Sequence, residues 1–434
     1  MRNMKRQAIA ALFAIVFGVS RAPAQSNTTT FVVRSVRVFD GERVSDTRTV
    51  VVVDGTIVAV GNADVPVPRG AQSIDGAGRT LLPGLIDAHV HVSPVFPREA
   101  LQQSLAFGVT TVIDMWTGPP PKGFAGTPAL VRLKEIERAD PPDLAAVRTA
   151  GTGATARGGH PTHMDGGWAA LVTPTISAPD DATAFVVARL AEGSDFIKII
   201  YDDAHASFGL TLPTLREDVI AALVSAAHAQ GRLAIAHIGT EGQAMGAMNA
   251  DVDGLAHVFI GPSISDEFVS LARRRGVFII PTLSTLYAVC GPSDGPAILG
   301  DSRVMTRVRP EFRVTLGLPG GGIQPSCAGA TAAVRQLSAA GVPLLAGTDA
   351  PGPGTTYGAS VHWELEHLVD AGMSLLAALA AATSVSARAF RLSDRGRIQS
   401  GMRADLLLVD GDPTTDIRAT RKIVKIWKRG IAQD

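Results

Sequence analysis

The sequence predicts an α/β protein that combines a TIM-type (β/α)8 barrel with a small β-sandwich domain. From residue 83 onward, short apolar strands alternate with helical segments, which is the pattern of parallel βα units. Near both chain ends the pattern is strand-like without helices, so we expect the two ends to build one sandwich together. The predicted organisation is a leader over 1–24, sandwich strands over 25–82 and 393–434, and the barrel over 83–392.

The barrel prediction depends on eight apolar segments that have the length and composition of buried strands. They are Leu85–Val92, Val109–Met115, Leu144–Gly151, Phe196–Asp202, Leu233–Ile238, Gly254–Val258, Val277–Leu283 and Pro343–Asp349. The Gly- and Pro-rich stretch from Ser284 to Gly329 interrupts this rhythm after the seventh strand. It is expected to be a lid over the barrel mouth, a surface decoration or an oligomer contact.

The composition indicates a compact globular protein with a large hydrophobic core. The chain has 434 residues, of which 46% are hydrophobic, which is enough for a barrel with an appended domain. Lys+Arg and Asp+Glu are both 40, so no basic field favours a nucleic-acid partner. We expect a small-molecule substrate instead.

The N-terminal segment has the pattern of a secretory signal peptide. Arg2, Lys5 and Arg6 precede an apolar run over 8–19, and Ala22-Pro23-Ala24 gives a cleavage site. The run is shorter than the roughly 20 residues that span a bilayer. We therefore expect a periplasmic or extracellular protein without stable membrane insertion, with an uncleaved anchor as the alternative.

The chain has two cysteines, Cys290 and Cys327. In an exported protein they are expected either to form a disulfide or to be two buried thiols.

His89 and His91 occupy the end of the first predicted barrel strand. Side chains two residues apart in a strand point to the same side, so both imidazoles would face one point. Two imidazoles placed in this way are the beginning of a zinc-type site. His237, His257 and Asp349 lie at the ends of the fifth, sixth and eighth strands.

Lys198, in the fourth strand, is the unusual member of this set. A free amine has a pKa near about 10.4 and is a poor ligand for a dication. Its carbamate, formed with carbon dioxide, is an anion that can bridge two metals. With that carbamate, Asp349 and a hydroxide, two divalent cations would keep about one positive charge to stabilise an oxyanion. The alternative is a structural ion pair of Lys198 with Asp202 or Asp203.

These residues resemble the amidohydrolase superfamily, and within it the imidazolonepropionase-like proteins that include Xaa-Pro dipeptidase-like hydrolases. The motifs that carry the resemblance are PGLIDAHVH, FIKI, the two later histidine strands, GTDAP and RADLLLVDGDP. The resemblance implies two zinc ions. It assigns His89, His91 and Asp349 to one metal and His237 and His257 to the other, with carboxylated Lys198 as the bridge.

The resemblance also implies metal-assisted hydrolysis by a hydroxide that both ions share. Asp349 would move the proton from the nucleophile to the leaving group, or would act only as a ligand. The glycine-histidine segment after the third strand matches a substrate loop of the family, although GGHPT differs from the GGHG-like form. Its histidine, His160, would donate to the carbonyl oxyanion or to a substrate carboxylate, or would be a structural loop residue. Tyr201 is similar to a substrate-binding tyrosine of the dipeptidase-like members. Arg157 is expected to clamp a carboxylate or to be a solvated loop residue.

The leading hypothesis is therefore a binuclear zinc hydrolase of an amide or peptide-like C–N bond, of dipeptidase or carboxypeptidase type, that forms a homo-oligomer. Two alternatives keep the same superfamily: a mononuclear deaminase or ring hydrolase, and a lactonase or esterase. The deaminase usually has a glutamate three residues after the strand-five histidine, where this chain has Thr240. A non-catalytic relative is the third class, and it would be expected to have lost ligands.

Overall fold

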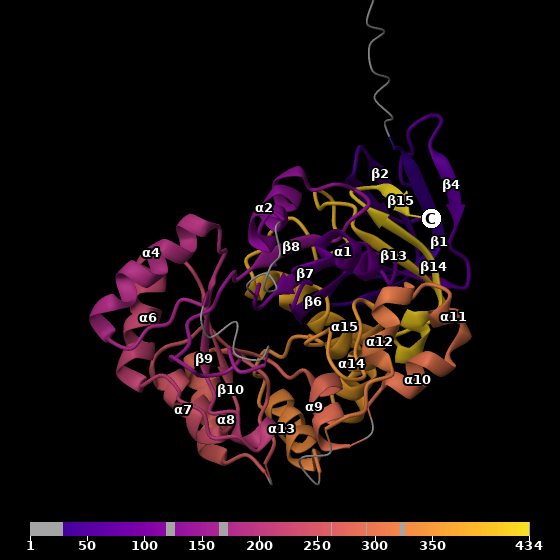
Figure 1. Cartoon of the computed structure of the whole chain (residues 1–434). Coiled ribbons are helices and arrows are strands. Elements are labelled where there is room, and N and C mark those ends of the chain that lie inside the picture. The colour runs from indigo at the N-terminus through magenta and orange to yellow at the C-terminus, as the bar shows by residue number, and fades with distance from the viewer. Residues whose placement is uncertain are drawn as a thin grey trace, which may run out of the picture.

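The computed structural model describes residues 29–118, 126–164, 172–261, 263–291, 293–321 and 326–433 (Figure 1). The predicted leader over 1–24 lies outside this described part. The described chain contains an eight-stranded sheet made from both chain ends, two parallel sheets, and helices that pack around them.

The sheet of the chain ends joins five N-terminal strands with three C-terminal ones. The strands are β1 Phe31–Phe39, β2 Val44–Val53, β3 Thr56–Gly61, β4 Gln72–Asp75, β5 Arg79–Pro83, β13 Leu406–Asp410, β14 Ile423–Lys428 and β15 Ile431–Gln433. The path is β15-β14-β13-β5-β1-β2-β3, and β4 also pairs with β1. The antiparallel pairing of β13 with β5 links the two ends. The ends were expected to form a β-sandwich, and the described strands form one hydrogen-bonded sheet.

Local sequence explains the tight turn of this sheet. Asp54 and Gly55 connect β2 to β3, and both have positive φ, of 49° and 76°. Asp tolerates this left-handed conformation better than most side chains, and Gly adopts it freely. On one face of the sheet, Phe31 stacks on Trp427 with ring centroids 5.0 Å apart.

The barrel region contains two parallel sheets with the orders β6-β7-β8 and β12-β11-β10-β9. Their strands are β6 Leu85–Val90, β7 Val109–Asp114, β8 Ala146–Thr149, β9 Ile197–Tyr201, β10 Ala234–Ile238, β11 Gly254–Ala256 and β12 Phe278–Ile280. Each lies inside the corresponding predicted segment. The eighth predicted segment, Pro343–Asp349, differs because it forms isolated bridges and no regular strand.

Three isolated parallel bridges connect the two sheets. Ala154 pairs with Ile199, Ile279 pairs with Leu344, and Val90 pairs with Ala350. The eighth segment thus lies between β12 and β6. The pairing is not continuous, however, so the described sheets do not by themselves establish one closed eight-stranded barrel.

Helices cover the outer side of these parallel sheets (Figure 1). The helices are α1 Pro97–Leu105, α2 Ala129–Ala139, α4 Ala182–Glu192, α5 His205–Phe208, α6 Glu217–Ala229, α7 Glu241–Asn249, α8 Asp266–Arg275, α9 Leu283–Cys290, α10 Gly295–Gly300, α11 Ser302–Met305, α12 Arg313–Leu316, α13 Ala328–Ala339, α14 Ala359–Asp370, α15 Leu375–Ala381 and α16 Ser384–Ala389. Short 3-10 helices are η1 Pro179–Asp181, η2 Pro310–Phe312 and η3 Ile417–Arg421. Apolar residues of the strands and helices form one large core between the two layers.

The described part of the 284–329 stretch packs on the helix layer. Ile298, Val304 and Leu316 form a buried cluster with Phe107 and Trp363, which lie just after α1 and in α14. A disulfide between Cys290 and Cys327 closes the stretch at its base, which is one of the two outcomes expected for the cysteines. The stretch is therefore anchored both by apolar packing and by a covalent link.

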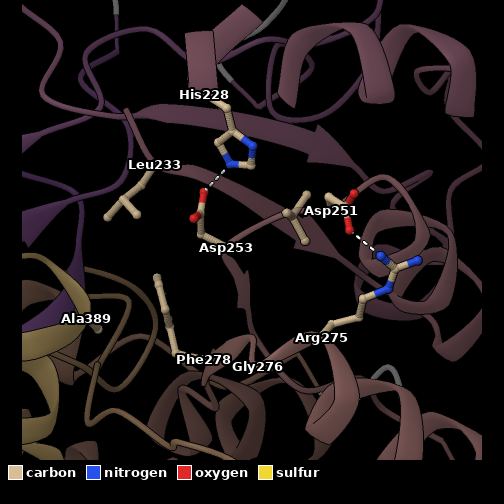
Figure 2. A pocket seen from close by; sticks show the side chains of 9 residues that line it. His228, Leu233, Asp251, Asp253, Arg275, Gly276, Phe278 and Ala389 are labelled. Atoms are coloured by element: carbon tan, nitrogen blue, oxygen red, sulfur yellow. Dashed lines mark hydrogen bonds and ion pairs between the residues drawn. The ribbon is translucent and has the colours of Figure 1, made fainter. Parts of the chain in front are cut away.

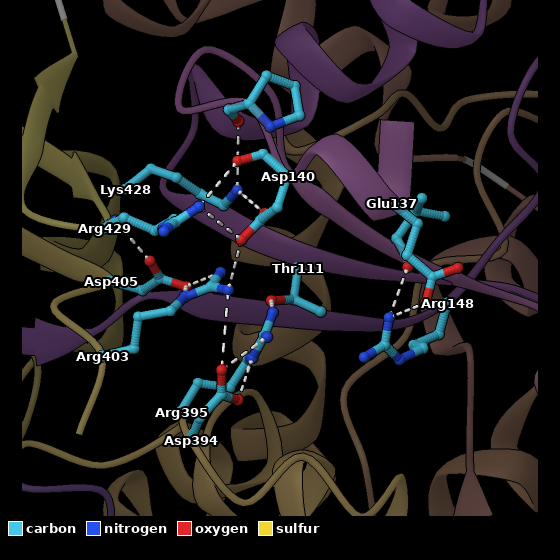
Figure 3. Close-up of polar contacts among 12 residues, drawn as sticks. Thr111, Glu137, Asp140, Arg148, Asp394, Arg395, Arg403, Asp405, Lys428 and Arg429 are labelled. Carbon is cyan, nitrogen blue, oxygen red and sulfur yellow. Dashed lines mark hydrogen bonds and ion pairs between the residues drawn. The ribbon is translucent and has the colours of Figure 1, made fainter. Parts of the chain in front are cut away.

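A partly buried network of charges joins the terminal sheet to the barrel region (Figure 3). Asp140, the C-cap of α2, accepts from Lys428 Nζ at 2.6 Å and from Arg403 Nη1 at 3.0 Å. Arg403 also pairs with Asp405, beside β13. Lys428 is fully buried, so its ammonium depends on Asp140 for compensation of its charge.

Among the described residues, none of the helices is long and apolar enough to cross a membrane.

Candidate metal centre

The histidines of the first barrel strand meet Asp349 of the eighth segment. Asp349 Oδ1 lies 3.2 Å from His89 Nε2 and 2.9 Å from His91 Nε2. The backbones are also joined, because Asp349 N donates to His89 O and His91 N donates to Ala350 O, both at 2.7 Å. The two segments thus hold three ligand-type side chains around one point.

Asp87 fixes this junction from inside the fold. Its carboxylate accepts from His89 N at 3.2 Å and from the amide and hydroxyl of Thr348 at 3.0 and 2.7 Å. Burial raises the pKa of Asp87 to about 7, although these hydrogen bonds oppose the shift. Asp87 therefore connects the backbone of one ligand to the residue that precedes another.

His237 and His257 form the second pair of imidazoles. His257 Nε2 lies 3.0 Å from His237 Nδ1, and the ring centroids are 4.5 Å apart. His257 Nδ1 lies 2.6 Å from the hydroxyl of Thr282, which in turn donates to Pro281 O at 2.7 Å. The rings of His89 and His257 are 4.8 Å apart, so the two halves of the site adjoin.

Asp202 and His160 lie on the other side of His237. Asp202 Oδ2 is 3.2 Å from His237 Nε2, and the His160 ring centroid is 4.9 Å from that of His237. Burial lowers the pKa of His160 to about 3, so the imidazole is neutral. His160 thus reaches the site as expected, whereas Asp202 had no functional role in the sequence analysis.

A strand-parity signal could have identified Asp202. Lys198, Ile200 and Asp202 are alternate residues of one strand and its end, so they point to the same side. Tyr201 has the opposite parity. Its hydroxyl donates to Glu217 at the start of α6 at 3.2 Å, which places the side chain toward the helix layer.

The structure therefore does not bring Tyr201 to the ligands, and its expected role in substrate binding stays a prediction. Arg157 is exposed, and within the described part of the chain it has no polar partner. Its expected role in binding a substrate carboxylate stays a prediction.

Lys198 is a deeply buried cationic residue at this site. It is 1% exposed, and its Nζ has no hydrogen-bond partner among the described residues. Burial lowers the pKa of Lys198 to about 7, although Asp349 and Asp114 oppose the shift. The alternative of a structural ion pair with Asp202 or Asp203 is not observed among the described contacts. A neutral amine, the form that reacts with carbon dioxide, is therefore accessible at neutral pH.

The donor set fits divalent metal ions. The donor atoms of His89, His257 and Asp349 lie within 4.8 Å of one another, as do those of His160, Asp202 and His237. Bonds of 2.0–2.2 Å in tetrahedral geometry separate ligand atoms by roughly 3.3 Å, close to the distances here. In the described structure, Nδ1 of His89 has no hydrogen-bond partner, and Nε2 has only the contact with Asp349 Oδ1 at 3.2 Å. Burial lowers the pKa of His89 to about 3, so it is in the neutral, metal-binding form.

Three residues at the ends of neighbouring strands have left-handed backbone conformations. The φ angles are 75° for His257, 54° for Thr282 and 58° for Asp349. Such conformations cost on the order of 1–3 kcal/mol each and cluster at functional sites, where surrounding structure enforces them. The carboxyl ends of these strands are therefore shaped for the site at the expense of local stability.

A separate surface cavity of about 370 Å³ opens at the opposite ends of the strands (Figure 2). Leu233, Asp253 and Phe278 line it at the starts of β10, β11 and β12. Asp253 holds His228 at 2.9 Å and also accepts from Ala234 N at 2.7 Å. These contacts account for His228 structurally, and in barrels this end contributes to stability more than to chemistry.

The fold and the cluster of ligands define a metal-dependent hydrolase of the α/β class. The family model for the amidohydrolase family matches residues 80–432, so the chain belongs to this family. It is a metal-dependent hydrolase that acts on carbon–nitrogen bonds.

Relatives and solved structures cover most of the chain. An uncharacterized protein of Mycobacterium tuberculosis is 27% identical over 83% of this chain and 85% of its own. The structure of a Xaa-Pro dipeptidase with bound methionine matches with a TM-score of 0.72 at 22% identity, covering 93% of this chain and all of that one. Molinate hydrolase matches with a TM-score of 0.73 at 21% identity, covering 94% and 95%. At these identities the structural matches demonstrate the shared fold alone.

Proposed function

We propose that this protein is a binuclear zinc hydrolase of an amide or peptide-like C–N bond, with N-acyl amino acids or dipeptides as substrates. The observation that carries the proposal is Lys198, a buried amine without a hydrogen-bond partner in the described structure, within the same site as four histidines and Asp349. A mononuclear site has no use for such a lysine. Carboxylated Lys198 would bridge two ions, one held by His89, His91 and Asp349 and the other by His237 and His257.

When bound, the zinc ions supply Lewis acidity and a hydroxide nucleophile at neutral pH. The residues of the chain then divide the remaining tasks. Asp349 has its pKa held well below its usual value, because the neighbouring histidines outweigh the effect of burial. It is anionic and can take a proton at Oδ2 while Oδ1 faces His89 and His91. His160, neutral and beside His237, is placed to orient the substrate through a ring nitrogen.

The substrate class is inferred from the loop chemistry and the structural neighbour. Arg157 is exposed after the third strand and would bind the carboxylate of an amino-acid leaving group. The Xaa-Pro dipeptidase with bound methionine shares the fold, which supports a substrate that contains an amino acid. Glu241, by contrast, accepts from Ser265 N at 3.1 Å and is thus engaged away from the ligands, which disfavours deaminase chemistry.

Three further features belong to this proposal. The isolated bridges support closure of the two parallel sheets into one (β/α)8 barrel. The disulfide and the N-terminal pattern support export to the periplasm or beyond. We also propose a homo-oligomer, which sedimentation of the purified protein would test.

The test is metal content together with hydrolysis of a panel of dipeptides and N-acyl amino acids by the wild type and Lys198→Ala. The wild type should hold about two zinc ions per chain and release free amino acids. Lys198→Ala should bind less metal, because the bridging ligand has been removed. Its kcat/KM should fall at least about a hundredfold. Full metal content and activity in Lys198→Ala would contradict the proposal, and ammonia release from nitrogen heterocycles would favour a deaminase.

A further inference from the structure

We propose that Asp202 is a positioning residue that holds the Nε2–H tautomer of His237, so that Nδ1 of this histidine faces the second metal position. The inference rests on the proposed function and extends it to a residue outside the expected ligand set. Its basis is the arrangement of hydrogen bonds on both sides of the His237–His257 pair.

The first step concerns the nitrogen of His237 that carries the proton. Nε2 lies 3.2 Å from Asp202 Oδ2, and Nδ1 lies 3.0 Å from His257 Nε2. A buried carboxylate is an acceptor only, so Nε2 is the nitrogen that donates. Nδ1 then presents its lone pair to His257.

The second step concerns His257. The hydroxyl of Thr282 has one hydrogen and donates it to Pro281 O at 2.7 Å. It therefore accepts from Nδ1–H of His257 at 2.6 Å, and this leaves a lone pair on Nε2. Two lone pairs 3.0 Å apart repel each other, so a cation between them satisfies both imidazoles at once. Asp202 and Thr282 thus prepare the two rings for one metal.

The third step is that the fold makes room for Asp202 and supplies few other partners for it. Asp202 is 2% exposed, and its Oδ1 accepts from Ala204 N at 3.0 Å. A Cβ at Gly239 would lie 2.2 Å from Oδ1, so glycine is required there for the carboxylate to approach His237. No lysine or arginine of the described chain pairs with Asp202. The Nε2–H group of His237 is therefore the side-chain donor that stabilises this buried carboxylate.

A different role for Asp202 is that of a ligand, because its oxygen also lies near donor atoms of His160 and His237. The geometry favours positioning, since Oδ2 faces Nε2 of His237, the nitrogen opposite the one that faces His257. A carboxylate that orients a metal-bound imidazole in this way typically contributes roughly 10- to 100-fold in metal affinity.

The experiment compares metal binding of the wild type with Asp202→Asn, Gly239→Ala and the control Asp203→Asn. Zinc retained per chain is measured against a competing chelator, and folding is checked by circular dichroism. Each protein is then saturated with cobalt, whose visible absorption reports the coordination geometry. Asp203 is the matched control because it is the adjacent carboxylate, which accepts from His205 N at 3.1 Å.

We expect Asp202→Asn to weaken retention of the second zinc by roughly 10- to 100-fold while the first is kept. Gly239→Ala should have the same effect, because it displaces the carboxylate without removing it, and Asp203→Asn should match the wild type. The cobalt spectrum of saturated Asp202→Asn should equal that of the wild type. Unchanged zinc affinity in Asp202→Asn and Gly239→Ala, or a cobalt spectrum that shows a lost ligand, would overturn the inference. A wild type that binds one metal or none would instead refute the proposed binuclear function.

Discussion

At the scale of single residues, the ligand side chains are held by hydrogen bonds from residues that carry no chemistry of their own. Asp87 holds the backbone of His89 and both groups of Thr348, and Thr282 holds Nδ1 of His257. Thr282 does so from a left-handed conformation that is unfavourable for a β-branched residue. The fold thus keeps an unfavourable backbone conformation at the residue whose hydroxyl lies 2.6 Å from His257 Nδ1.

Replacement of Thr282 tests this interpretation. Thr282→Val removes the acceptor for His257 Nδ1–H while it keeps the shape, so zinc affinity should fall by roughly 10- to 100-fold. Thr282→Ser keeps the hydroxyl and is the matched control, with affinity close to the wild type. Competition with a chelator measures both, and equal affinities of the two variants would contradict the role of the hydroxyl.

At the scale of elements, the 284–329 stretch has an ionic attachment besides its apolar packing. His367 of α14 lies 2.9 Å from both carboxylate oxygens of Asp294, which precedes α10. Burial alone would lower the pKa of His367, but the hydrogen bond and charge of Asp294 outweigh burial and raise it. The attachment is strongest when the imidazole is charged.

The raised pKa of His367 predicts a pH dependence of stability with a definite sign. The contribution of the pair is fully present below the unfolded pKa of about 6.5 and is lost as pH rises through the higher folded pKa. The difference in thermal stability between the wild type and His367→Gln should therefore shrink as pH rises from about 6 into the alkaline range. Asp294→Asn should abolish the same dependence, and a constant difference across this range would argue against the ion pair.

The disulfide predicts a second property of the same stretch. Cys290 and Cys327 are 37 residues apart, and closure of such a loop stabilises the fold by roughly 4 kcal/mol in the chain-entropy view. The double variant Cys290→Ser and Cys327→Ser should unfold at a lower denaturant concentration, and its free energy of unfolding should be smaller by about this amount. Urea titration under non-reducing conditions measures it, and a wild type with reduced cysteines should behave like the variant.

Comparison of the predicted and observed elements indicates which parts of the fold and the site follow from the sequence. The apolar strands, the helices between them and the strand ends of His89, His237 and His257 follow from local pattern, and the structure has them where predicted. The irregular form of the eighth segment does not follow from local pattern, because its backbone bridges depend on two strands that are distant in the sequence. Asp202 and Tyr201 depend on which side of one strand each residue faces. The carboxylate of Asp140 and its partners come from segments so far apart that no local pattern connects them.

At the scale of the whole molecule, the Asp140 network joins the terminal sheet to the barrel region. Lys428 Nζ and Arg403 both bind Asp140, and Lys428 is fully buried. Although burial opposes it, the hydrogen bond of Lys428 and the charge of Arg403 lower the pKa of Asp140. The pairing therefore stabilises the fold above the unfolded pKa of about 4 and is lost as pH falls through the lower folded pKa.

Asp140→Asn should destabilise the protein by about 3 kcal/mol, because it leaves the Lys428 ammonium buried without a counter-charge. Lys428→Met with Asp140→Asn should recover much of this loss, since neither buried charge then remains. Thermal unfolding of the three proteins at neutral pH is the measurement. Asp143→Asn, a change at an exposed ion pair with Arg98, is the control and should have little effect.

The pairing of β13 with β5 has a consequence for the order in which the chain becomes a folded protein. β13 and β5 occupy the middle of the terminal sheet, between β14 and β1, so the sheet stays incomplete until β13 has been synthesised. Contacts of such long range slow folding, because the intervening chain must first be ordered. The native sheet therefore cannot form before β13 has been synthesised, and a chain that stalls before β13 has an unpaired edge at β5.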